Sequence, residues 1–171
     1  EILSPDVELV VLYKSKDTKL NNIVVEDTAL NVEGSDFMGT QIKHIYEQLG
    51  DDKFNGHKTT WEVSLCMKKD EYFYIATGKT EGILKYPALD FGYHFDRILA
   101  IKNDKGEYQH FELYTPEEKQ LIGPRFKALR LLTTAIEKND YSQLKIIHEK
   151  DVPLWGGQYQ EEKKQEKKIK P

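Results

Sequence analysis

Residues 23–32 read IVVEDTALNV, and this stretch decides the fold. The acidic pair Glu26 and Asp27 follows three branched apolar residues, a pattern typical of a buried strand that ends in carboxylates. Such a strand can hold a carboxylate rigidly at the open edge of an α/β sheet, where ligands bind. Neighbouring strand residues point to opposite faces, so at most one of the two acids faces a crevice directly.

A carboxylate in that position suits Mg²⁺. This ion usually takes one or two protein carboxylates and completes its shell with water and substrate phosphates. The competing interpretation is that Glu26 and Asp27 cap the following turn or pair with a lysine, as surface acids commonly do. The residues of this stretch leave both interpretations open.

Composition sets the broad class of the protein. The chain has 171 residues, 39% of them hydrophobic and 32% charged, which fits one globular domain. We expect that domain over residues 1–158, followed by a charged tail over 159–171. No apolar run approaches the roughly 20 residues that a membrane helix needs, so no membrane partner is expected.

The cysteine content indicates the cellular compartment, and the net charge indicates the kind of partner. The lone Cys66 excludes an internal disulfide and a metal–thiolate cluster, which favours a reducing, cytoplasmic compartment. The net charge is −4 and the basic residues are scattered, so no nucleic-acid partner is expected. The first residues contain no methionine and no signal-peptide pattern, and we expect further residues upstream.

Periodicity and turn residues predict the elements. Strands are expected over 6–13, 23–28, 59–67, 71–77, 80–84 and 97–101. Helices are expected over 40–49, from Thr115 as a short helix or loop, from about Pro124 as a longer helix, and over 141–150.

Few segments carry a chemical motif. Gly78, Lys79 and Thr80 resemble the end of a P-loop, but Phe73 stands where that motif needs glycine, and the context is strand to strand. The five histidines show no paired spacing for zinc. In residues 86–96 (YPALDFGYHFD), aromatic side chains around a glycine can form a slot for a nucleobase. Phe91 and Tyr93 are the candidates, and the alternative is that both belong to the core.

In their order along the chain, these segments resemble the inosine triphosphate pyrophosphatase family, which hydrolyses deaminated purine nucleoside triphosphates to the monophosphate and pyrophosphate. LVVL with VVEDTALNVEG is similar to the family's V-E-D-T/S-x-L strand, and GTQIKHIYEQLG resembles the helix after it. GKTEGIL is similar to G-x-T-x-G-x-I, DFGYHF to F-G-[WY]-D-P, and EEKQLIGPRFKALRLL to E-K-N-x-x-S-H-R-x-x-A-L. The likeness extends over about residues 1–133.

The resemblance implies an α/β fold: an elongated, two-lobed protein with a long twisted mixed sheet and flanking helices, commonly a homodimer. It implies that Asp27 is the catalytic, metal-linked acidic residue, which either ligates Mg²⁺ or orients the attacking water, with Glu26 in support, and that the partner is a purine nucleoside triphosphate. Phe91 would stack on the purine, and Arg125 matches the arginine of S-H-R. The full set of implied substrate-binding residues is Thr28, Phe91, Gly92, Tyr93, His94, Lys119 and Arg125.

Some segments depart from the family pattern. The T-x-N-x-x-K loop would precede Glu1, and only YKSKDTKLNN stands where the family has a helix with a second essential glutamate. His94 replaces the base-reading aspartate, and Gly123 with Pro124 replaces Ser-His. Two hypotheses therefore stand: a Mg²⁺-dependent pyrophosphohydrolase of deaminated or modified purine NTP or dNTP, or a catalytically impaired nucleotide-binding or interaction protein on the same fold. An unrelated α/β domain is the third.

Overall fold

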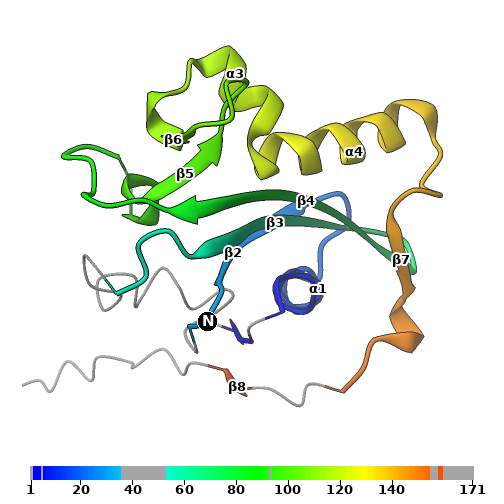
Figure 1. Cartoon of the computed structure of the whole chain (residues 1–171). Helices are drawn as coiled ribbons and strands as arrows, with labels where there is room; N and C mark the ends of the chain where they lie inside the picture. The colour runs from blue at the N-terminus through cyan, green and yellow to red at the C-terminus, as the bar shows by residue number, and fades with distance from the viewer. Residues whose placement is uncertain (1, 5, 36–52, 93, 155–157, 160–171) are drawn as a thin grey trace, which may run out of the picture.

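A long, twisted antiparallel sheet runs through the molecule (Figure 1). The computed structural model describes residues 2–4, 6–35, 53–92, 94–154 and 158–159. The strands of the main sheet follow the order β2-β3-β4-β5-β6, and β7 pairs with β4. Their bounds are β2 (Val24–Val32), β3 (Lys58–Lys69), β4 (Tyr72–Leu84), β5 (Leu99–Lys102), β6 (Tyr108–His110) and β7 (Lys145–His148).

Three helices and a small second sheet complete the described chain. The helices are α1 (Val7–Thr18), α3 (Pro116–Ile122) and α4 (Pro124–Lys138), with the short 3-10 helices η2 (His94–Arg97), η3 (Phe111–Leu113) and η4 (Glu149–Asp151). The small sheet joins β1 (Ile2–Leu3) to β8 (Gln158–Tyr159). No helix in these ranges is long and apolar enough to cross a membrane.

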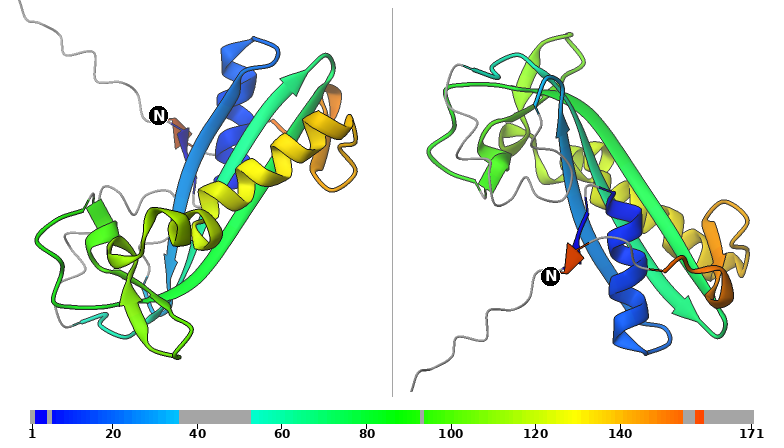
Figure 2. Two further views of the ribbon diagram at one scale, coloured as in Figure 1. Left: turned by 90° about the horizontal axis from the view of Figure 1, so that it is seen from above. Right: turned by 90° about the horizontal axis from the view of Figure 1, so that it is seen from below.

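Helices α1 and α4 cover opposite faces of the sheet, as the views from above and below show (Figure 2). Alternation along β3 serves both faces: Leu65 packs with Leu132 of α4, and Cys66 packs with Val11 and Leu12 of α1. The middle of β3 is therefore buried on both sides, which explains its almost unbroken apolar run.

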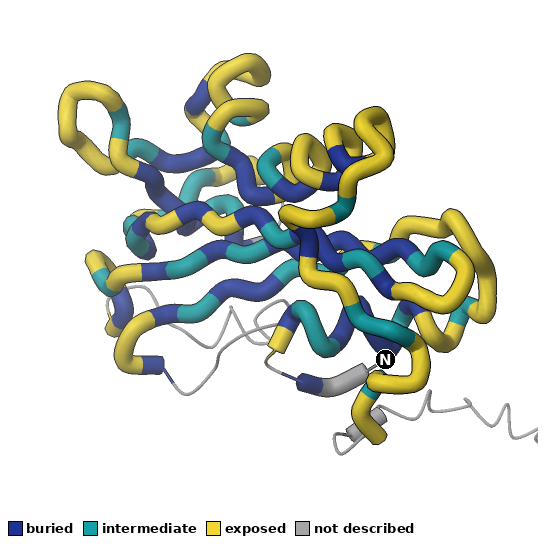
Figure 3. The backbone as a smooth tube through the Cα atoms, turned by 90° about the vertical axis from the view of Figure 1, so that its right-hand side faces the viewer, coloured by how far each residue is buried: buried dark blue, intermediate teal, exposed yellow. Residues whose placement is uncertain are grey.

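A separate core lies at the other end of the sheet, under β5, β6 and η3. Its aromatic centre is Trp61, whose ring lies edge-on at 4.9 Å from Phe111 and 6.2 Å from Phe95. Buried backbone lies in the middle of the molecule, and exposed backbone forms the outer turns and loops (Figure 3). These cores confirm the elongated α/β fold with two lobes. All strand pairs in the described ranges are antiparallel, whereas the resemblance implied a mixed sheet.

Residues 7–18 form the helix α1, so the strand predicted over residues 6–13 is wrong. The carboxylate of Asp6 accepts hydrogen bonds from the backbone N–H groups of Glu8 and Leu9, at 3.0 and 3.2 Å, and so caps α1. A short apolar run cannot distinguish a buried helix from a buried strand, because nearly every side chain is covered in both. Helix α1 also directly precedes β2, so the expectation that no helix stands there was wrong as well.

Two further strand boundaries differ from the predictions. Strand β2 continues past the acidic pair to Val32, because it pairs with β3 along its whole length. Residues 72–84 form the single strand β4, although Gly78 was expected to separate two strands. Gly78 instead permits close packing: a Cβ there would lie 2.0 Å from the carbonyl oxygen of Pro124, at the start of α4.

Residues 141–150 were predicted as a helix, but they contain the strand β7. Two β-branched residues, Ile146 and Ile147, pair with Tyr74 and Phe73 at the edge of β4. That free edge offers backbone partners which local periodicity does not reveal.

The other predicted elements are confirmed with small shifts. Strand β5 spans Leu99–Lys102 where 97–101 was expected. Thr115 begins α3 with a capping box, in which the Thr115 hydroxyl accepts from the Glu118 N–H at 3.2 Å and the Glu118 carboxylate accepts from the Thr115 N–H at 3.1 Å. The helix predicted at 40–49 lies outside the described residues, as does most of the tail.

Candidate functional site

The acidic pair of β2 is divided between the two faces of the sheet. Glu26 faces α4 and binds Arg125, while Asp27 faces α1 and contacts Lys14. The two acids thus point in opposite directions, as the alternation of a strand predicts. They lie within the strand rather than at its end, because the pairing of β2 with β3 continues to Val32.

Asp27 is held by its own strand and by α1. Its Oδ1 accepts a hydrogen bond from the Thr28 N–H at 2.9 Å, and its Oδ2 lies 3.5 Å from Lys14 Nζ. Only 10% of the Asp27 side chain is exposed, against 34% for Lys14. Lys14 Nζ also donates to the Glu26 carbonyl oxygen at 3.2 Å. We call Asp27 and Lys14 the α1-side pair.

Polar side chains continue from Asp27 across the sheet beneath α1. Ser64 is the cross-strand partner of Asp27, and its hydroxyl lies 2.6 Å from the hydroxyl of Thr77. Thr77 donates to the Glu8 carboxylate at 2.9 Å, and Lys145 contacts the same carboxylate at 3.2 Å. A row of hydrogen-bonding groups therefore crosses the face of the sheet that α1 covers.

On the opposite face, Glu26 and Arg125 form a two-point ion pair. Arg125 donates from Nε and from one terminal nitrogen to the two carboxylate oxygens of Glu26, at 2.8 and 2.7 Å. Arg125 belongs to the first turn of α4, so the pair joins that helix to β2. Because both side chains are well exposed, the pair adds little to stability, but it fixes the orientation of the guanidinium plane.

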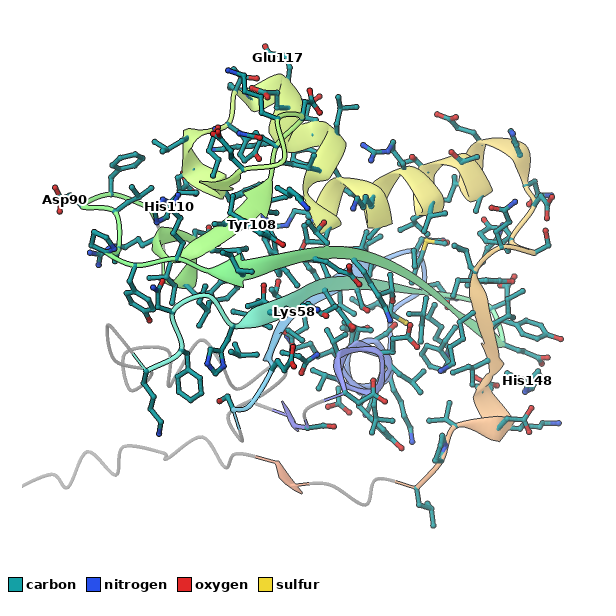
Figure 4. The ribbon with its side chains drawn as sticks, viewed as in Figure 1. Lys58, Asp90, Tyr108, His110, Glu117 and His148 are labelled. Carbon is teal, nitrogen blue, oxygen red and sulfur yellow. The ribbon has the colours of Figure 1, made fainter. Side chains whose placement is uncertain are left out.

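The aromatic loop after β4 presents Phe91 to solvent. Phe91 is 53% exposed, so it is not a core residue and its ring is open to stacking. Asp90 lies at the outer tip of this loop (Figure 4). Gly92 has a φ of +108°, and a Cβ there would lie 3.1 Å from Glu112 Cγ, so the loop packs closely on η3. Tyr93 lies outside the described residues, and His94 begins η2.

Lys119 and an unpredicted aspartate lie next to that loop. Lys119 pairs with Glu112 at 3.2 Å and lies 5.5 Å over the ring of Phe111. Asp96, in η2, was missed by the sequence reasoning. Burial, reinforced by the nearby Glu112, raises the pKa of Asp96 to about 6, while Arg125 and Lys119 act in the opposite direction. A carboxylate two residues after His94 was the available signal.

The structure therefore brings some predicted residues together and separates others. Glu26, Gly92, Lys119 and Arg125 meet on the α4 side with Asp96 and Glu112, and we call these six residues the α4-side cluster. Phe91 adjoins it in the chain. Asp27 lies across β2 from the cluster, and Thr28 holds it through the backbone. In the described ranges β2 pairs with β3 alone, so its other edge lies between the two groups.

The donor chemistry at Asp27 fits Mg²⁺. The described part of the chain contains no group of three or more His, Cys, Asp or Glu side chains that could hold a metal. Mg²⁺ does not need such a group, since one carboxylate can suffice when substrate phosphates and water complete the shell. Asp27 offers that carboxylate once Oδ2 exchanges its contact with Lys14.

Comparisons with known proteins found a sequence relative and a solved structure of similar fold. No family model matches the chain. The inosine triphosphate pyrophosphatase of Mycosarcoma maydis is 29% identical over 119 residues, which cover 64% of this chain and 60% of that protein. The chain thus spans about three fifths of the length of this relative.

A solved structure shares the fold. The Ham1 protein of Staphylococcus aureus aligns with a TM-score of 0.61 and 16% identity, over 81% of this chain and 80% of that one. The chain is therefore similar in sequence to an inosine triphosphate pyrophosphatase and shares the fold of the Ham1 protein.

Proposed function

We propose that this protein is a Mg²⁺-dependent pyrophosphohydrolase that converts deaminated or modified purine NTP or dNTP to the monophosphate and pyrophosphate. The observation that carries the proposal is the α4-side cluster. It assembles residues from β2, the aromatic loop, α3 and α4 that are far apart in sequence but were selected together by the family resemblance. The name of the Mycosarcoma maydis relative supports the same reaction class.

The base is proposed to bind on the α4 side. The exposed ring of Phe91 offers a stacking surface, and the positive φ of Gly92 brings the backbone close to Glu112. Arg125 and Lys119 present donors to the oxygen that deamination places on a purine. Asp96 can accept a hydrogen bond when ionised and donate one when protonated. It would therefore form the hydrogen bond to the base for which His94 was the candidate.

The triphosphate is proposed to cross the edge of β2 to the α1-side pair. Lys14 reaches both the Asp27 carboxylate and the Glu26 carbonyl oxygen, so its ammonium group already lies between the two faces. A phosphate bound there would pair with the ammonium group of Lys14. The Asp27 carboxylate would then be available to bind Mg²⁺. One nucleotide would then contact both groups around the strand edge.

Asp27 is proposed to hold Mg²⁺ and orient the attacking water. The metal supplies a positive charge for the phosphate oxygens. Strand pairing and the Thr28 N–H fix the Asp27 carboxylate in one orientation, so little reorganisation is needed when substrate binds. Glu26 supports the site indirectly by orienting Arg125.

The test is pyrophosphate release from a panel of purine ribo- and deoxyribonucleoside triphosphates with Mg²⁺. Asp27→Asn should lower kcat by roughly 100-fold or more, because a neutral amide neither holds the metal nor accepts a proton. Asp70→Asn is the matched control: Asp70 lies in the β3–β4 turn with a φ of 55°, which asparagine also adopts readily. Equal activity in both variants, or no release from any nucleotide, would refute the proposal.

A nucleotide-binding protein without turnover is the second candidate. The specific observation in its favour is that Lys14 already neutralises Asp27, whose side chain is nine-tenths covered. This alternative predicts that calorimetry shows saturable binding of a purine triphosphate and that no pyrophosphate forms in the calorimeter cell. Detection of pyrophosphate would eliminate it.

The remaining assignments stay proposals. We propose one domain over residues 1–158 with a charged tail over 159–171, a cytoplasmic location, a homodimer, and no nucleic-acid or membrane partner. The outer side of α4 is compatible with a partner subunit, because Phe126, Leu129 and Ile136 are between 36% and 46% exposed there. Light scattering of wild type against a Leu129→Glu variant tests the dimer.

A further inference from the structure

A basic groove lies between α4 and β4, outside the α4-side cluster. Its volume is about 590 Å³. Three cationic side chains and one carboxylate line it, together with small polar residues: the charged side chains are those of Lys127, Arg130, Lys138 and Asp140. Lys79 also lines the groove, but its ammonium group pairs with Glu62 at 3.4 Å on the other face of the sheet. This local excess of positive charge contrasts with the net charge of −4 of the whole chain. We call it the α4–β4 groove.

The groove and the candidate site lie on different flanks of α4. Arg125 extends from the helix toward β2, whereas the groove adjoins β4 on the side away from β3. On that side β4 pairs with β7 at residues 72–75 and with β5 at residues 83–84. In the described chain, residues 76–82 between them have no strand partner there, and the groove opens beside them.

Two of the cations have only neutral partners. Lys127 Nζ donates to the Lys79 carbonyl oxygen at 2.7 Å and to the Thr80 hydroxyl at 3.1 Å. Arg130 donates to the Gln120 carbonyl oxygen at 2.6 Å. Neither forms an ion pair with any residue that the structure describes.

The charge of Lys127 is disfavoured where it lies. Burial, and then the neighbouring positive charge of Arg130, lower the pKa of Lys127. Asp140 also lines the groove, but it forms no ion pair with Lys127 or Arg130 in the described structure. A bound anion would therefore lower the repulsion between these two neighbouring cations, and charged hydrogen bonds to phosphate are about twice as strong as neutral ones.

We propose that the α4–β4 groove binds a small polyphosphate, free or carried by a nucleotide, at a site separate from the proposed catalytic one. The volume is in the usual range for small-molecule sites, about 300–1,000 Å³. Lys127 and Arg130 would bind phosphate oxygens directly. The more exposed Lys138 would add attraction at the rim.

The experiment titrates the metal-free protein, in EDTA, with inorganic tripolyphosphate and separately with ATP, by calorimetry. The Lys127→Met/Arg130→Gln double variant should bind both at least about tenfold more weakly, given the strength of hydrogen bonds to charged groups. Lys105→Met/Lys150→Gln removes the same charge from two exposed lysines outside the groove, and should stay within about twofold of wild type. Lys138→Gln, at an exposed helix end, gives a smaller loss without disturbing packing.

The two possible sources of phosphate give different results. Similar affinity for tripolyphosphate and ATP identifies the phosphate chain as the ligand, whereas tighter ATP binding identifies a nucleotide. Both should persist in an Arg125→Gln background, which disables the proposed base site, so loss of one function does not imply loss of the other. Equal affinity of wild type and the double variant, dependence on Arg125, or tighter length-dependent binding of single-stranded oligonucleotides would overturn the proposal.

Discussion

The partly buried carboxyl of Asp96 gives a prediction that links stability to the site. Its pKa rises from the ordinary 3.8 to about 6 in the folded protein, chiefly through burial and then through Glu112. The folded state therefore binds this proton more tightly than the unfolded chain. The side chain costs no stability below the unfolded pKa, because it is protonated in both states. The cost grows as the pH rises through the interval between the two values, and is complete above about pH 6.

The magnitude follows from the size of the shift. A difference of about two pKa units corresponds to about 3 kcal/mol, as an order of magnitude. Asp96→Asn keeps the shape of the side chain and removes the ionisation. The variant should therefore be more stable than wild type by up to about 3 kcal/mol at pH 7.5 and almost unchanged at pH 4.

Urea unfolding at both pH values measures this difference. Asp90→Asn, a neighbour exposed at the tip of the aromatic loop, is the control and should show no such gain. The reasoning fails if Asp96→Asn gains nothing at pH 7.5, or if it gains equally at both pH values. The same variant should bind purine triphosphates more weakly, because it lacks the negative charge that attracts Arg125 and Lys119. Binding sites commonly contain an acid that lowers stability but serves function.

Three further outcomes are expected. Gly78→Ala should destabilise the protein by about 3 kcal/mol in urea unfolding, because the new Cβ would lie 2.0 Å from the backbone oxygen of Pro124 and α4 would have to move; a loss under about 1 kcal/mol would contradict this packing. Arg125→Lys should change stability by less than about 1 kcal/mol but raise KM for the nucleotide roughly tenfold, since lysine cannot make the two-point contact with Glu26; unchanged KM would count against the proposed base site. Burial raises the pKa of the Cys66 thiol to about 12, so iodoacetamide at pH 8 should leave it unmodified in the native protein and alkylate it in urea.

Much of the fold could be predicted from local patterns. The strand β3, the helix that begins after Thr115 and the longer helix that begins at Pro124 all appear in the structure where the sequence predicts them. Each depends on chemistry within a few residues: side-chain alternation in a strand, a hydroxyl near free N–H groups, and a proline that begins a helix.

The failures share one cause. A strand was predicted over residues 6–13, where the chain forms a helix, and a helix over residues 141–150, where it forms β7. In both segments the interactions that stabilise the observed element come from distant parts of the chain. Helix α1 is buried against β3, and β7 is held by the edge of β4. Local periodicity cannot reveal such partners, because they lie far away in the sequence. Burial against these partners outweighs the local propensity for helix or strand.

Part of the candidate site could likewise be predicted from the sequence, and part could not. The family likeness selected Glu26, Lys119 and Arg125, and the structure joins them through Glu112 and Asp96. Alternation alone predicted that Glu26 and Asp27 would point apart. It could not predict that Lys14 covers one acid while Arg125 binds the other, since those partners come from helices on opposite faces of the sheet.

The sequence by itself determined the central strands β2 and β3, the start of α3 and the likeness to the inosine triphosphate pyrophosphatase family, because these depend on residue order and near neighbours. Only the tertiary structure decided which side chains share a face, which carboxyl is buried enough to retain a proton at pH 5, and where unpaired cations gather beside α4. Those properties depend on distance and on exclusion of water, and both are set by segments that meet only after the chain has folded.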